Sequence, residues 1–366
     1  MKLVAIQSLS PGACLAKPIL DEAGNTLINT GIPLTETIIN RLQQRGVTFV
    51  YIGDKRTNDI VVNSTSTIPF SLRKKAMESV EDVFHSLQKK HEKTRVALLE
   101  QSVREVHKVG NQLVDEIMNN NDVLSLLTDV YIYDNYVFSH SVNVTLYALS
   151  LGKEIGLTQP VLEKLGAGAM LHDVGKMLIP QDILNKPGRL TDEEFKLMKK
   201  HTTYGYELLR STPNVSALSA SCAYQHHERL DGSGYPLGIK EERIHLFSKI
   251  IAIADVYDAV TSNRVYRSAL LPHEGLEILY AGAGSQFDKD MISAFRRAIA
   301  VYPIGLFVTL NDQRKGIVSK QNKGLSDRPY ILIQEEGGRV LDKPYEIDLK
   351  ESPTLIIITQ TSHLNN

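Results

Sequence analysis

Short apolar runs separated by polar turns open the chain. Over residues 1–56 these runs predict three strands, at 3–6, 14–20 and 48–53. Residues 33–45 predict a helix between them, with Thr35 as its N-cap and Gly46 as its stop. The first 56 residues are therefore expected to form a small α/β unit.

The pattern changes over residues 57–124. Asn, Ser and Thr dominate 57–69, which is typical of a linker. Two long helices are then predicted near 70–93 and 95–119, because apolar residues recur there at spacings of three and four: Ala76, Val80, Val83 and Leu87, then Leu99, Val103, Val106, Leu113 and Ile117. Such a seam can form a coiled-coil homodimer through residues 70–119. The alternative is a helical hairpin that packs on its own domain.

From 125 to 302 the pattern is helical throughout. Pro160 suits a first helical turn, and Thr191 with Glu194 forms a capping-box signature. Residues 303–366 return to alternating apolar and polar positions with turns, which predicts a small β unit. The expected fold is therefore multidomain and mainly α: an all-helical catalytic domain flanked by a small N-terminal α/β unit, a helical linker and a small C-terminal β unit.

Composition narrows the classes of partner. The formal net charge is −1, so no overall basic field favours DNA or RNA. No apolar run reaches the roughly 20 residues that cross a bilayer, and the N-terminus lacks the apolar core of a signal peptide. The two cysteines, Cys14 and Cys222, are too few for a disulfide framework or a CxxC zinc site. We therefore expect a cytoplasmic protein.

Ligand-type side chains interrupt apolar stretches of the helical domain. Asp255 lies within the apolar run IAIADVYDAVTS, and the pair His172–Asp173 follows Met170 inside the helix predicted to begin near Pro160. An unpaired buried carboxylate costs several kcal/mol, and a bound cation removes that cost. A lone histidine is usually a surface or satisfied core residue, but several in one domain favour a shared metal site. The other candidates are His140 at a predicted helix start, His201 at the end of the helix begun at Thr191, and the pair His226 and His227.

The spacing of these residues suggests the chemistry. Adjacent residues on a helix diverge by about 100°, so His172 and Asp173 would straddle two ions, with the carboxylate bridging them. Lys176 would project from the same face, and a cation beside a metal site is favourable when an anion such as phosphate lies between them. Nitrogen and oxygen ligands suit iron, manganese or zinc. Two such ions can share a hydroxide nucleophile and clamp a phosphoryl group, which predicts a bimetallic phosphohydrolase.

Four ordered motifs resemble the HD-GYP family of metal-dependent phosphohydrolases: LHDVGK at 171–176, ILNKPGRLT at 183–191, HHERLDGSGYP at 226–236 and ADVYDAVTSNRVYR at 254–267. The resemblance implies hydrolysis of cyclic di-GMP to linear pGpG, with GMP as the product of a further cut. It also implies two divalent metal ions, with iron or manganese as the first candidates. It implies one ion held by His140, His172, Asp173 and Asp255. The second ion would be held by Asp173 with His201, His226 and His227.

The same resemblance implies substrate contacts. Lys176 would contact the scissile phosphate, and Lys186, Arg264 and Arg267 would contact further phosphate oxygens. The glycines of GSGYP allow a ligand close to the backbone, so Tyr235 could stack on or hydrogen-bond to the substrate. The loop would also be a docking surface for GGDEF-type cyclase domains. An ordinary turn between helices is the alternative for this loop.

One position departs from the family pattern. Some members bind a third metal through a Glu four residues before the first ligand histidine, and here that position is Tyr136. We therefore expect two ions. Two other functions stay open: a non-hydrolytic cyclic di-GMP receptor, and a hydrolase of another cyclic dinucleotide.

Overall fold

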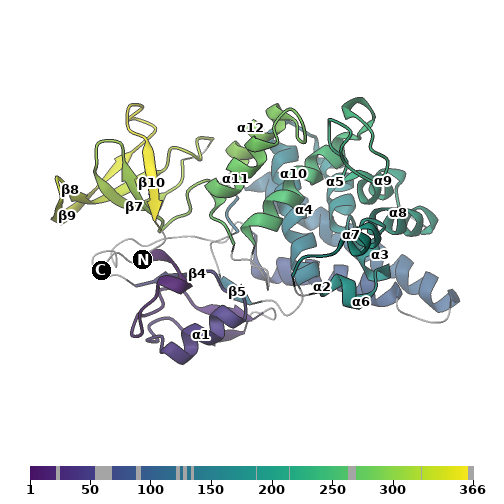
Figure 1. Cartoon of the computed structure of the whole chain (residues 1–366), viewed down its shortest axis with the longest axis horizontal. Helices are drawn as coiled ribbons and strands as arrows, with labels where there is room; N and C mark the ends of the chain where they lie inside the picture. The colour runs from purple at the N-terminus through teal and green to yellow at the C-terminus, as the bar shows by residue number, and fades with distance from the viewer. Residues whose placement is uncertain are drawn as a thin grey trace.

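The computed structural model describes residues 1–21, 25–53, 68–87, 92–120, 124–126, 130–132, 136–186, 188–213, 215–262, 269–322 and 324–361. Helices dominate it, as the sequence predicts. In Figure 1 the helical domain lies on one side, and the N-terminal unit and the C-terminal sheet lie together on the other. The predicted linker falls almost entirely within 54–67, outside the described residues.

The N-terminal unit contains four strands and one helix: β1 (Lys2–Ala5), β2 (Ile19–Asp21), β3 (Thr26–Ile28), α1 (Glu36–Gln44) and β4 (Phe49–Ile52), with a 3-10 turn η1 (Ile6–Ser8) after β1. Thr35 is the N-cap of α1, as predicted, and its hydroxyl accepts a hydrogen bond from the Ile38 amide. Strands β1 and β4 pair antiparallel, with Leu3 opposite Tyr51. Successive residues of these strands point into two different cores, which explains their continuous apolar sequence.

The C-terminal unit is a five-stranded antiparallel sheet in the order β10-β6-β7-β8-β9. Its strands are β6 (Phe307–Leu310), β7 (Lys315–Lys320), β8 (Tyr330–Glu336), β9 (Arg339–Asp348) and β10 (Ile357–Thr361). Strand β9 contains Pro344, and as an edge strand it tolerates proline because one side of its backbone needs no partner. Leu3 and Tyr51 share a core with Leu306 and Ile331, so the N-terminal and C-terminal units pack together.

The two long helices form a hairpin, α2 (Phe70–Leu87) and α3 (Glu92–Asn119). Their predicted seam is buried in the same core as the helical domain; Val80, Val103 and Leu113, for example, are fully covered within this one chain. The alternative of a hairpin packed on its own domain therefore describes this seam. A homodimer through residues 70–119 would need other surfaces of the two helices, and it stays a prediction.

Helices α4 and α10 run through the middle of the helical domain and pack against each other (Figure 1). The domain consists of α4 (Tyr136–Glu154), α5 (Gln159–Met170), η2 (Val174–Leu178), α6 (Gln181–Leu184), α7 (Asp192–Lys199), α8 (His201–Ser211), α9 (Ala217–Gln225), η3 (Glu241–Arg243), α10 (Leu246–Thr261), α11 (Pro272–Ala281) and α12 (Lys289–Ala298). The expectation that 125–302 is helical throughout misses one strand, β5 (Val130–Ile132), which pairs parallel with β2. Within the described residues, no helix is both long enough and apolar enough to span a bilayer.

Candidate metal centre

The pair His172–Asp173 lies in a turn, not inside a helix as predicted. Helix α5 ends at Met170, and the chain continues as a turn into the 3-10 segment η2. The segment η2 packs closely against α8, where a Cβ on Gly175 would lie 2.0 Å from the backbone oxygen of His201. The break lets both side chains face one centre, where His172 Nε2 lies 3.3 Å from Asp173 Oδ2.

His201 also lies elsewhere than predicted. Thr191 and Glu194 form the expected capping box, but α7 ends at Lys199 and His201 is the first residue of α8. His201 is buried, and its Nδ1 donates a 2.7 Å hydrogen bond to the Met198 carbonyl. The end of one helix thereby orients the imidazole at the start of the next.

One group of ligand atoms joins α4, the turn after α5, and α10. The group consists of His140, His172 and Asp255, whose ligand atoms all lie within 4.8 Å of one another. His140 Nε2 lies 3.2 Å from Asp255 Oδ1, while its Nδ1 donates a 2.7 Å hydrogen bond to Asp258 Oδ2. Asp258 therefore supports an imidazole through its far nitrogen, which is the arrangement common behind metal-binding histidines.

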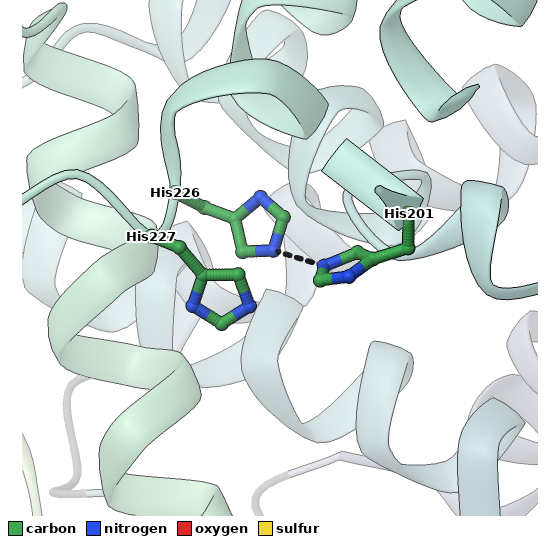
Figure 2. Close-up of side chains that lie close together, drawn as sticks. All are labelled: His201, His226 and His227. Atoms are coloured by element: carbon green, nitrogen blue, oxygen red, sulfur yellow. Dashed lines mark hydrogen bonds between the residues drawn. The ribbon is translucent and has the colours of Figure 1, made fainter. Parts of the chain in front are cut away.

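A second group consists of His201, His226 and His227, again with ligand atoms within 4.8 Å. Figure 2 shows the three imidazoles facing one another, with Nε2 of His201 and Nε2 of His226 3.3 Å apart. His226 follows the end of α9, where its Nδ1 donates to the Cys222 carbonyl. His227 is the next residue, and its Nδ1 lies 3.8 Å from Asp255 Oδ2.

Asp173 lies between the two groups. Its Oδ2 is 3.5 Å from His140 Nε2, and its Oδ1 is 3.5 Å from His201 Nε2 and 3.8 Å from His226 Nε2. The carboxylate is fully buried. The structure thus brings together all seven residues that the sequence singled out as metal ligands.

Electrostatics leaves most of these groups in the form that binds metals. Burial lowers the pKa of His201 to about 4 and that of His226 to about 3, so both imidazoles are neutral near pH 7. Burial would raise the pKa of Asp173, but the charges of Lys176 and His172 hold it well below its usual value. His140 differs: burial lowers its pKa, yet the hydrogen bonds and charges of Asp255 and Asp258 raise it to about 9. Metal binding requires deprotonated ligands, so His140 must lose a proton before it can bind an ion.

The donor set fits divalent metal ions. Among the described residues, His172 Nε2 and Asp173 Oδ1 are buried polar atoms without a hydrogen-bond partner. Such atoms are costly to bury unless something else satisfies them. The other nitrogen of His172 is already used, because Nδ1 donates to the Ala169 carbonyl. The free lone pairs therefore converge on a site that cations would stabilise.

Two predicted phosphate contacts behave differently. Lys176 Nζ lies 2.5 Å from Asp173 Oδ2, at the edge of the cluster, and its side chain is 23 % exposed. Lys186 Nζ instead contacts both oxygens of Glu194, at 2.7 and 2.6 Å, so its contact with phosphate stays a prediction. Arg264 and Arg267 lie outside the described residues, and so does the side chain of Tyr136 at the first position of α4.

The GYP loop is built around a buried acid that the sequence reasoning did not single out. The Glu228 carboxylate accepts hydrogen bonds from the amides of Leu237 and Ile239, which fixes the loop. Position 234 requires glycine because a Cβ there would lie 2.4 Å from the backbone nitrogen of Arg229. The loop presents Tyr235 to the cluster, where its ring stacks on His227 with centroids 4.7 Å apart. Docking of a GGDEF domain on this loop stays a prediction.

Comparison with known proteins agrees with this site. Residues 121–291 match the family model described as HD domain. The chain is 37 % identical over 232 residues to cyclic di-GMP phosphodiesterase PA4108 of Pseudomonas aeruginosa, covering 62 % of this chain and 55 % of the relative. It is also 37 % identical over 166 residues to 3'3'-cGAMP-specific phosphodiesterase 1 of Vibrio cholerae, covering 45 % of this chain and 38 % of the relative. The chain thus spans little more than half of one relative's length and less than half of the other's.

A solved structure shares the fold. Bd1817 of Bdellovibrio bacteriovorus, described as an HDG"Y"P protein, matches with a TM-score of 0.52 and 16 % identity, covering 80 % of this chain and 97 % of that one. At this identity the likeness concerns the fold alone. The sequence motifs and the family match agree: residues 121–291 match the HD domain model, and the motifs within them resemble those of the HD-GYP family.

Proposed function

We propose that this protein is a metal-dependent phosphodiesterase that hydrolyses cyclic di-GMP to linear pGpG. The observation that carries the proposal is the position of Asp173, a fully buried carboxylate between two groups of imidazole nitrogens with the Lys176 ammonium beside it. A shared carboxylate between two nitrogen-rich groups suits two adjacent divalent ions.

The two groups give the ligand assignment. His140, His172, Asp173 and Asp255 would hold one ion, and Asp173, His201, His226 and His227 the other. Iron and manganese suit these nitrogen and oxygen ligands. Bound there, two divalent ions supply Lewis acidity to a phosphoryl oxygen and lower the pKa of water.

The chain's own residues bind and orient the substrate around that centre. Lys176 follows Asp173 by one 3-10 turn, so its ammonium would contact a phosphate bound at this centre and would stabilise negative charge on the phosphoryl oxygens. Tyr235, stacked on His227, covers one side of the centre with an aromatic face. The imidazoles of His140, His172, His201 and His226 are buried, and a low local dielectric strengthens electrostatic contacts there.

The substrate class rests on the named relatives. The relative from P. aeruginosa is named for cyclic di-GMP, and one from V. cholerae for 3'3'-cGAMP, so hydrolysis of 3'3'-cGAMP is the second candidate. Both molecules are cyclic purine dinucleotides with two phosphodiesters. Initial rates with each substrate, on the same metal-loaded preparation, test the proposal: a higher kcat/KM for cyclic di-GMP supports it, and a higher value for 3'3'-cGAMP reverses the order of the two candidates.

A further inference from the structure

Helix α7 holds an exposed aromatic side chain beside the metal centre. None of its residues is buried, and the Phe195 side chain is 46 % exposed. The ring does not face open surface alone, because it lies edge-on to Tyr235 with centroids 6.3 Å apart.

A lysine lies between these two rings. Lys199 Nζ is 5.0 Å from the centroid of Phe195 and 5.5 Å from that of Tyr235. Within the described residues this ammonium contacts no carboxylate, whereas Lys176 contacts Asp173 and Lys186 contacts Glu194. Two aromatic faces thus hold a cation whose hydrogen-bonding capacity is open to a ligand.

Tyr235 connects this pair to the metal centre. Its ring stacks on His227 with centroids 4.7 Å apart, and it also makes the edge-to-face contact with Phe195. A row of rings therefore extends outward from the proposed ligands, formed by His227, Tyr235 and Phe195. Lys199 lies beside the last two of these rings.

We infer that Phe195 and Lys199 form a subsite for the nucleotide half of a cyclic dinucleotide that lies away from the scissile phosphate. The Phe195 ring stacks on the purine base, and the Lys199 ammonium contacts the second phosphate. This inference rests on the proposed function for its ligand, and it adds two residues that the family motifs did not single out. Stacking on an aromatic side chain tolerates either purine, so the subsite recognises a purine nucleotide of either kind.

The test compares affinity in single variants of the full chain. In Phe195→Ala and Lys199→Met, the Kd of cyclic di-GMP measured by calorimetry and its KM measured from initial rates should rise about tenfold. Metal content and kcat should stay at wild-type values, and Phe195→Tyr should restore affinity because it keeps the ring. Matched controls on the same helix are Leu197→Ala and Lys196→Met, which remove an exposed apolar side chain and a charge without touching the subsite.

Methyl p-nitrophenyl phosphate, a diester with one phosphate and no nucleoside, provides a second control. Both variants should turn it over as the wild type does. Equal losses on both substrates would place the residues in the catalytic centre and overturn the subsite. Wild-type Kd and KM for cyclic di-GMP in both variants would overturn the subsite while leaving the proposed function intact. If the wild type binds cyclic di-GMP without hydrolysing it, hydrolysis fails as the function, and the Kd values still decide the subsite; a wild type that does not bind it overturns both.

Discussion

Asp258 accepts a 2.7 Å hydrogen bond from Nδ1 of His140 and thereby joins α10 to α4 behind the metal centre. Both side chains are buried. This bond fixes the ring orientation that directs Nε2 of His140 toward Asp255.

Replacing Asp258 by Asn should therefore weaken metal binding without removing a ligand. Loss of such a supporting carboxylate typically lowers metal affinity about 10–100-fold, and we expect a loss in that range for Asp258→Asn. Competition titration with a chelator measures it. Ser262→Ala is the matched control, because that hydroxyl donates to the other oxygen of Asp258 and its loss should change metal affinity far less. Wild-type affinity in Asp258→Asn would show that the bond does not orient the ligand.

Asp173→Ala should lose both ions and all activity, because one carboxylate lies between the two groups of ligands. Elemental analysis of the purified variant checks this, with far-UV circular dichroism as the control for folding. Full occupancy of either ion in a folded Asp173→Ala protein would sink the bridging role.

Lys176→Ala should keep both ions and slow hydrolysis. Removing one donor to a developing negative charge typically costs about 10²–10³ in kcat. The variant also removes the charge that holds the Asp173 pKa down, but bound cations supply the same stabilisation. Metal content and kcat measured on one preparation separate the two effects, and loss of metal in Lys176→Ala would mean that the lysine builds the site instead.

Gly175→Ala should destabilise the protein and reduce its metal content, since the new Cβ would meet the His201 backbone. Either α8 or the turn with His172 and Asp173 must move. Gly166→Ala in α5 is the matched control: its Cβ would lie 3.5 Å from Leu149, an ordinary contact, and alanine favours a helix by up to about 1 kcal/mol. Thermal unfolding and elemental analysis of both variants measure these effects. Equal stability and equal metal content in Gly175→Ala and Gly166→Ala would contradict the packing argument.

Periodicity and motifs predicted the helical domain, the two flanking units and the set of seven clustered side chains. They did not predict where α5 ends, because Leu171 to Lys176 contains no local stop stronger than Gly175. Beyond the end of α5, Gly175 packs on His201, a contact between segments far apart in sequence that no local pattern reveals. Strand β5 gave no local signal either, since it is three residues long and pairs with β2 from the N-terminal unit.

Most of the hydrogen bonds that orient the histidines could not be predicted from the sequence either. Three of the imidazoles donate to backbone carbonyls, those of Ala169, Met198 and Cys222, and every residue type offers a carbonyl. Asp258 did have a signal in the sequence, as a second acid one turn beyond Asp255. Glu228 had a signal as well, an acid directly after two histidines, but its role in fixing the loop depends on amides nine and eleven residues later.

The proposed function is hydrolysis of cyclic di-GMP at a two-ion site. The most direct measurement is anaerobic turnover of cyclic di-GMP by protein supplied with iron or manganese, followed by chromatographic separation of the products over time. We expect linear pGpG to accumulate. Some family members bind a third metal through a Glu at a position where this chain has Tyr136, and two ions are expected to make only one cut. Rapid conversion to GMP would contradict the two-ion account, and no product from fully metallated protein would contradict the phosphodiesterase itself.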